Sequence, residues 1–150
     1  MKRMIVTAAI MGISFSAAAA PGLAPGGPGP KGPLGPGYHE LTVATVAGPG
    51  EPVETRVLLE TPHLKLASVT LRQGATLAEH SAPMQVTIQA ISGSGTVKLS
   101  GDKSVRVEAG KLVVLAPNMP HSVVADDKSD LIVLVHHIKG GGPGGGRGPR

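Results

Sequence analysis

Two histidines in glycine-marked segments are the residues of this chain with the clearest chemical potential. His80 follows Gly74 after five intervening residues, and His121 follows Gly110 in a second such segment. Neutral imidazole is a good ligand for Fe, Mn, Ni, Cu and Zn, so two histidines from separate strands would supply half of a coordination shell. Catalytic metal sites usually have three protein ligands, so a third donor would have to come from elsewhere.

Three other side chains near these histidines are candidates for further metal ligands. Gln85 offers a neutral amide oxygen, which is a poorer donor than a carboxylate. Met84 and Met119 are the only methionines beyond residue 19, and thioethers combined with imidazoles favour copper, above all Cu(I). Each candidate has a structural alternative. Gln85 would be a solvent-facing strand residue, and the methionines would be flexible apolar filler at the mouth of a barrel.

The remaining histidines are weaker candidates for metal ligands. His136 and His137 are adjacent near the end of an apolar segment, so strand geometry points one of them inward and the other outward. His63 begins an early strand, and His39 adjoins a Gly/Pro-rich segment. We expect each of these to be structural or exposed.

Composition excludes several other chemistries. The chain has no cysteine, so thiolate metal sites, disulfides and a cysteine nucleophile are absent. It has no Gly-x-Ser-x-Gly elbow, phosphate-binding loop or paired carboxylates, so hydrolase and nucleotide functions lack residue support. The only aromatic residues are Phe15 and Tyr38, and the basic residues are scattered. We therefore expect no nucleic-acid partner.

The first 19 residues are typical of a secretory signal peptide. Lys2 and Arg3 precede an apolar stretch that ends in small residues suited to cleavage after Ala19. The stretch is shorter than the roughly 20 apolar residues that span a bilayer. We therefore expect a periplasmic or secreted protein that has no membrane association after the signal is removed.

The mature chain divides into three parts by composition. Residues 20–38 and 139–150 are rich in Gly and Pro, which cannot bury enough apolar surface to fold, so we predict a flexible leader and a flexible tail. Residues 39–138 carry the fold.

Short alternating apolar segments separated by turn residues predict an all-β domain over residues 39–138. About eight such strands fit a small antiparallel β-barrel or jelly roll, whose closure removes exposed edges. The predicted strands are Val53–Glu60, Leu64–Arg72, Val86–Ile91, Thr96–Leu99, Val105–Glu108, Leu112–Leu115, Ser122–Ala125 and Leu131–Ile138.

The first histidine segment resembles the first sequence motif of the cupin family, the RmlC-like cupin superfamily. That motif has Gly, five residues, His-x-His, three or four residues, Glu, six residues and Gly. Here Gly74, His80 and Gly93 are in register, whereas Ala82 stands at the second His and Val86 at the Glu. Two of the four ligands that the family uses are thus replaced.

The second segment resembles the second cupin motif, which has Gly, five residues and Pro-x-Gly-x-x-His. Gly110, Ala116, Asn118 and His121 occupy the corresponding positions. Asn in place of Gly is a mild change because Asn also tolerates the left-handed backbone conformation. The resemblance to cupins extends over about 70 residues, from 67 to 136.

The cupin resemblance implies a small exported protein that binds a divalent transition metal (Fe, Mn, Ni, Cu or Zn) through His80 and His121. It also implies a cavity for a small-molecule ligand, with oxygenase or isomerase chemistry as the reaction class. Many cupins form dimers, so a homodimer partner is a further expectation. No positioned general base is visible, so the sequence leaves open whether the protein is an enzyme.

Two alternatives remain open at this stage. The first is a non-catalytic cupin scaffold that binds a small ligand or a partner protein. The second is a periplasmic copper-binding protein that uses His80, Met84, Met119 and His121 as ligands.

Overall fold

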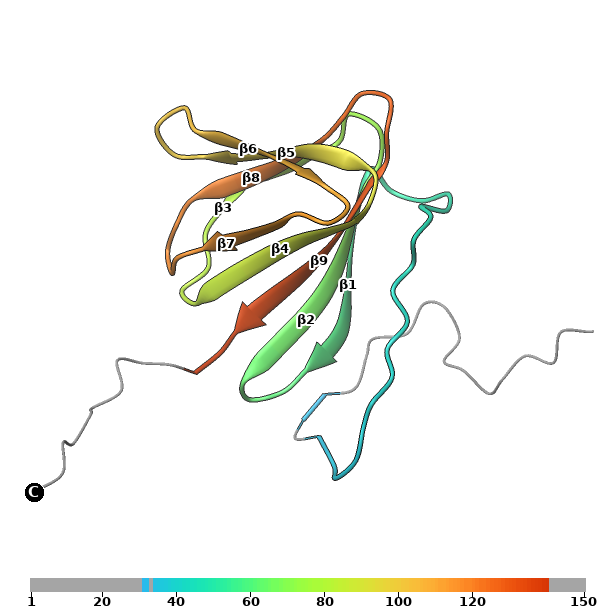
Figure 1. Ribbon diagram of the computed structural model, residues 1–150, viewed down its shortest axis with the longest axis vertical. Helices are drawn as coiled ribbons and strands as arrows, with labels where there is room; N and C mark the ends of the chain where they lie inside the picture. The colour runs from blue at the N-terminus through green and yellow to red at the C-terminus, as the bar shows by residue number, and fades with distance from the viewer. Residues whose placement is uncertain (1–30, 33, 141–150) are drawn as a thin grey trace, which may run out of the picture.

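The computed structural model describes residues 31–32 and 34–140, and all regular structure within them is β-strand. Nine antiparallel strands form two sheets that face each other (Figure 1). No helix in this described part is long and apolar enough to cross a membrane. The predicted all-β fold, a small antiparallel barrel of the jelly-roll kind, is confirmed.

One sheet has five strands and the other has four. The five-stranded sheet runs in the order β1 (Val53–Glu60), β2 (Leu64–Leu71), β9 (Leu131–Ile138), β4 (Gln85–Ser92) and β7 (Leu112–Leu115). The four-stranded sheet runs in the order β3 (Thr76–His80), β8 (His121–Ala125), β5 (Ser94–Leu99) and β6 (Ser104–Glu108).

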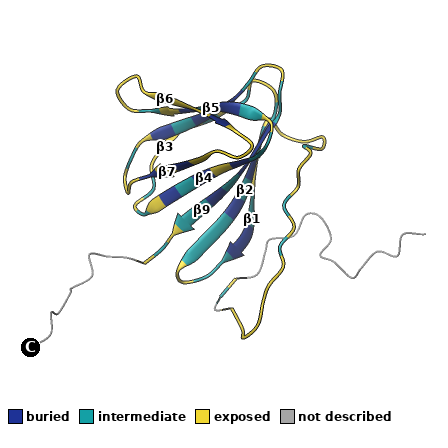
Figure 2. Cartoon of the chain, viewed as in Figure 1, coloured by how far each residue is buried: buried dark blue, intermediate teal, exposed yellow. Residues whose placement is uncertain are grey.

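The core lies between the two sheets and is aliphatic throughout. In β4, Val86, Ile88 and Ala90 are buried, while Gln89 between them is exposed, which is the two-residue period of a strand with one face inward. Figure 2 shows the same alternation of buried and exposed residues along the neighbouring strands. Tyr38 is 90 % exposed, so no aromatic side chain fills this core among the described residues. Branched aliphatic side chains pack it instead.

Strand β3 is the element that the alternation did not predict. Its sequence is Thr-Leu-Ala-Glu-His, and only Leu77 is even partly buried. β3 lies at the edge of its sheet and pairs only with β8. An edge strand with one inward apolar residue lacks the repeated apolar signal on which the sequence prediction depended.

Left-handed turns lie at the positions where the motifs place Gly or Asn. Gly74, Gly93 and Gly110 have φ angles of +71°, +75° and +90°, and Asn118 has a φ of +61°. This conformation is costly for residues other than Gly and, to a lesser degree, Asn and Asp. The tolerance expected for Asn118 in place of a motif glycine is thus realised.

The ends of the described chain both contact Glu60 at the end of β1. The backbone N–H of Gly32 donates to the carbonyl of Glu60 at 2.8 Å, and the Lys139 Nζ lies 2.7 Å from the Glu60 carboxylate. These contacts place part of the predicted leader and the start of the predicted tail against the barrel. The predicted signal peptide, residues 1–19, lies outside the described residues and stays a prediction.

Candidate functional site

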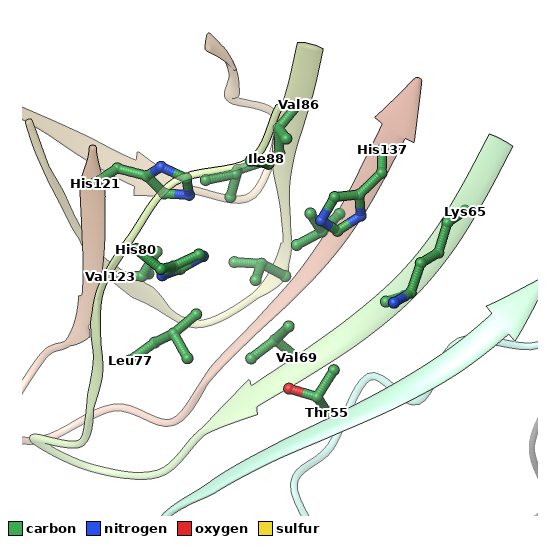
Figure 3. Close-up of a pocket in the computed structure, with 14 residues that line it drawn as sticks. Thr55, Lys65, Val69, Leu77, His80, Val86, Ile88, His121, Val123 and His137 are labelled. Atoms are coloured by element: carbon green, nitrogen blue, oxygen red, sulfur yellow. The ribbon is translucent and has the colours of Figure 1, made fainter. Parts of the chain in front are cut away.

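A cavity of about 220 Å³ opens between the two sheets (Figure 3). Most of its wall is aliphatic, and the polar groups lie in two separate places. His80 and His121 come from the four-stranded sheet, whereas Lys65 and His137 come from the five-stranded sheet. The full lining consists of Thr55, Lys65, Ala67, Val69, Leu77, His80, Ala82, Val86, Ile88, His121, Val123, Val133, Val135 and His137.

The two motif histidines are neighbours across paired strands. His80 ends β3, His121 begins β8, and the two residues pair directly in the register of these strands. Their ring centroids are 4.4 Å apart, and the ring planes are tilted by 54°. The structure therefore brings the two histidines together in one cavity, as their motif positions indicated. Metal binding by the pair stays a prediction.

The same hydrogen bond fixes the orientation of each ring. Nδ1 of His80 lies 2.8 Å from the carbonyl oxygen of Ala78, and Nδ1 of His121 lies 2.9 Å from that of Met119. A carbonyl oxygen can only accept, so in both neutral rings Nδ1 carries the proton and donates it. Nε2 of each ring then has a free lone pair. A histidine held in this way is oriented for metal binding through Nε2.

Burial gives the two histidines different environments. His121 is only 3 % exposed, and its burial lowers the pKa of the imidazole from the usual 6.5, with the nearby His80 ring as a smaller cause. The side chain is therefore neutral at pH 7, as a metal ligand must be. His80 is exposed at the end of β3, so the pair connects the cavity with solvent.

The loops beside the two histidines are joined by a backbone hydrogen bond. The N–H of Asn118 donates to the carbonyl of Ala82 at 2.7 Å. Ala82 and Val86, which replace the second His and the Glu of the first cupin motif, both line the cavity. The chain thus keeps the geometry of the motif but presents aliphatic groups at these two positions.

The three other candidate ligands lie outside the cavity lining. Gln85 is exposed and precedes the inward Val86, so the strand period directs it away from the cavity. Met119 is partly buried and packs against the aliphatic core, and Met84 is partly buried without contributing to the lining. The structure does not bring these three side chains to the histidine pair as cavity residues.

The described residues contain no group of three or more His, Cys, Asp or Glu side chains arranged to hold a metal ion. The metal-donor set at the His80–His121 pair is therefore two imidazoles. Two ligands with free Nε2 lone pairs suit a transition metal that takes its other ligands from water or from a bound molecule. They do not suit Mg²⁺ or Ca²⁺, which require oxygen ligands.

The inward histidine of β9 is His137, and its neighbour His136 faces the other way. Nδ1 of His136 is 2.9 Å from the hydroxyl oxygen of Thr87, which is its partner in the β4–β9 register. His137 lines the cavity and pairs in register with Lys65 of β2. The sequence analysis did not identify Lys65. Its two-residue spacing from Ala67 and Val69 was the signal that could have placed it on the inward face.

The antiparallel two-sheet barrel and the motif glycines at its turns define a cupin. Residues 67–137 match the cupin domain family, so this part of the chain is a cupin domain. Some cupins are enzymes, and the family often binds metal ions. Comparison with curated protein sequences finds no match.

Solved structures with the same fold have low sequence identity to this chain. A double-stranded β-helix protein from Klebsiella pneumoniae is 21 % identical, with a TM-score of 0.58, over 64 % of this chain and 84 % of that chain. An RmlC-like cupin from Desulfovibrio desulfuricans is 22 % identical, with a TM-score of 0.55, over 66 % and 97 %. DMSP lyase DddQ from Ruegeria pomeroyi is 17 % identical, with a TM-score of 0.54, over 58 % and 47 %. These likenesses establish the fold alone.

Proposed function

We propose that this cupin holds one divalent transition-metal ion through Nε2 of His80 and His121 and binds a small molecule in the adjoining cavity. The observation that carries the proposal is the matched pair of Nδ1 hydrogen bonds to backbone carbonyls, which leaves both Nε2 lone pairs free. The ring centroids are 4.4 Å apart, so the two rings are close enough for one ion to reach a nitrogen of each ring through bonds of about 2.0–2.1 Å.

The reaction class that we propose is oxygenase or isomerase chemistry, by likeness to other cupins. A bound metal would supply Lewis-acid polarisation of an oxygen atom of the ligand. The chain itself would hold the metal with His80 and His121 and exclude water with the aliphatic wall. No carboxylate lines the cavity, so a proton acceptor from this chain would have to be a histidine or Lys65.

A second function, a non-catalytic ligand-binding scaffold, is favoured by one specific observation. Ala82 and Val86 present aliphatic groups to the cavity at two positions where cupin metal sites have ligands. Two protein ligands hold a metal less firmly than three or four. The same barrel could then bind its small molecule with no metal involved.

We also propose that the protein acts in the periplasm or outside the cell, because residues 1–19 have the composition of a secretory signal. Mass spectrometry of protein isolated from a periplasmic fraction tests this. A mature mass that begins at Ala20 supports export, and an uncleaved chain in the cytoplasmic fraction contradicts it.

Thermal unfolding with added metal tests the metal proposal. A ligand that binds only the folded state stabilises it by about 2.7 kcal/mol at 100 times its Kd. We expect Mn, Fe, Ni, Cu or Zn ions to raise the Tm of the metal-free chain and a chelator to reverse the shift. His80→Ala removes one proposed ligand at an exposed position, so it should abolish the shift without unfolding the barrel.

His63→Ala is the matched control, because His63 is also exposed but lies outside the cavity. It should keep the metal-dependent rise in Tm. The proposal fails if none of the five metals raises the Tm, or if His80→Ala and His63→Ala respond alike. In that case the scaffold function remains.

A further inference from the structure

The wall of the cavity contributed by β1, β2 and β9 has its own polar group, separate from the histidine pair. Lys65 on β2 and His137 on β9 are register partners, and Thr55 on β1 adds a hydroxyl. In Figure 3 these side chains lie on the opposite side of the cavity from His80 and His121, with aliphatic side chains between the two groups.

The charge of this wall is positive and uncompensated within the cavity. Lys65 is the only lining residue with a permanent charge, and no Asp or Glu lines the cavity. The carboxylate closest to Lys65 in the strand register is Glu60 of β1. Glu60 forms its ion pair with Lys139, at 2.7 Å, and Lys65 contributes only a smaller part of the lowering of the Glu60 pKa.

His137 adds hydrogen-bonding capacity without adding charge. It is partly buried, and burial lowers its pKa from the usual 6.5, with the charge of Lys65 as the second cause. Its Nδ1 is buried without a well-formed hydrogen bond among the described residues, and the backbone of Lys65 beside the ring acts on its pKa in the opposite direction, raising it. The rings of His80 and His121, by contrast, are both held by backbone carbonyls. His137 therefore lines the wall beside Lys65 as a partly buried, uncharged ring.

We propose that the cavity binds a small organic monocarboxylate, with its carboxylate against Lys65 and its apolar body along the aliphatic wall. One lysine beside a neutral histidine balances a single negative charge, which favours a monoanion over a phosphate dianion. The surrounding Val69, Val133 and Val135 offer apolar contact, and pockets of this composition use a few polar groups to orient a ligand. The cavity of about 220 Å³ limits the ligand to a small molecule.

This proposal needs no metal, because Lys65 and His137 belong to the opposite wall from the histidine pair. It can therefore be tested on the full chain after treatment with a chelator. Failure of the metal proposal leaves this proposal intact, and the reverse also holds.

The test is a pair of NMR titrations of the metal-free chain, with backbone amide shifts as the readout. Butyrate and benzoate are the probes, and butyramide and benzamide are their uncharged counterparts. We expect saturable shifts on β2, β4 and β9 with the carboxylates and affinities at least about tenfold lower for the amides, because a charge-assisted hydrogen bond contributes that much.

Lys65→Met removes the charge and keeps the aliphatic stem, and it should weaken carboxylate binding by about tenfold while leaving amide binding unchanged. Lys98→Met is the control, because Lys98 is exposed on β5 and does not line the cavity. Circular dichroism checks that both variants fold. The proposal is overturned if neither carboxylate binds saturably, if acid and amide bind equally, or if Lys65→Met behaves as Lys98→Met does.

Discussion

Replacing Gly93 with Ala should destabilise the barrel far more than the same replacement at Gly101. Both glycines have a φ of +75°. A Cβ at position 93 would lie 1.7 Å from the carbonyl oxygen of Asp130 and 3.1 Å from the Cα of Leu131, whereas a Cβ at position 101 would meet nothing within 4 Å. Comparing Gly93→Ala with Gly101→Ala therefore separates the effect of a steric clash from the effect of backbone strain.

The size of the effect follows from these distances. Left-handed strain costs roughly 1–2 kcal/mol at either site, and the smaller entropy of the unfolded Ala chain offsets about 0.4–1 kcal/mol of it. We therefore expect Gly101→Ala to lower the free energy of unfolding by about 1 kcal/mol. At position 93 the clashing atoms belong to the backbone next to Leu131, which is fully buried. Relieving the clash must shift the core, which typically costs a further 1–3 kcal/mol or so.

Urea unfolding followed by far-UV circular dichroism measures this difference. Fluorescence is a poor probe here because the chain has no Trp and Tyr38 is 90 % exposed. We expect Gly93→Ala to be about 2 kcal/mol or more less stable than Gly101→Ala, or to be unfolded. A difference of less than about 0.5 kcal/mol, which is within the range of surface substitutions, would refute the close approach of β4 and β9 at this turn.

Three further outcomes are expected. Burial lowers the pKa values of His136 and His137 below 6.5, so their contribution to stability is complete above about pH 6.5 and is lost as the pH falls toward the folded-state values. Urea unfolding at about pH 7.5 and about pH 5 should therefore show a larger loss of unfolding free energy in wild type than in a variant that carries both His136→Gln and His137→Gln. Equal losses in the two proteins would contradict this. At φ +61°, Asn118→Val should lower the unfolding free energy by about 1–2 kcal/mol relative to Asn118→Gly, and equal urea midpoints would argue against a left-handed residue there. Neither methionine lines the cavity. Replacing both Met84 and Met119 with Leu should therefore leave the affinities for Cu and Ni, measured by calorimetry, within about twofold of wild type. A selective loss of copper binding would instead support the copper-binding alternative.

The sequence predicted those strands in which apolar residues repeat every second position. In β4 the alternation of Val86, Ile88 and Ala90 with polar residues fixed both the strand and its inward face. β3 was not predicted because its only inward apolar side chain is Leu77. Its position depends on pairing with β8, which is a tertiary contact that no local pattern contains.

The candidate site was predictable where it depended on motif spacing and unpredictable where it depended on the face of a strand. His80 and His121 could be paired from their motifs alone. Gln85 is one position away from the inward Val86, and in a strand one position reverses the direction of the side chain. Lys65 was missed because a lysine in a strand usually indicates the solvent face. Only the barrel as a whole shows that this lysine lines a cavity.

Glu60 receives contacts from both ends of the described chain. The backbone of Gly32 and the side chain of Lys139 both bind it, so these two ends of the described chain lie at one corner of the barrel, beside the strand pair that carries Lys65. Chain ends that lie this close tolerate being joined. A circular permutant that links residue 139 to residue 31 and opens at the exposed turn around Gly101 should therefore fold. It would retain the cavity while moving both ends to the opposite sheet, away from the lysine wall.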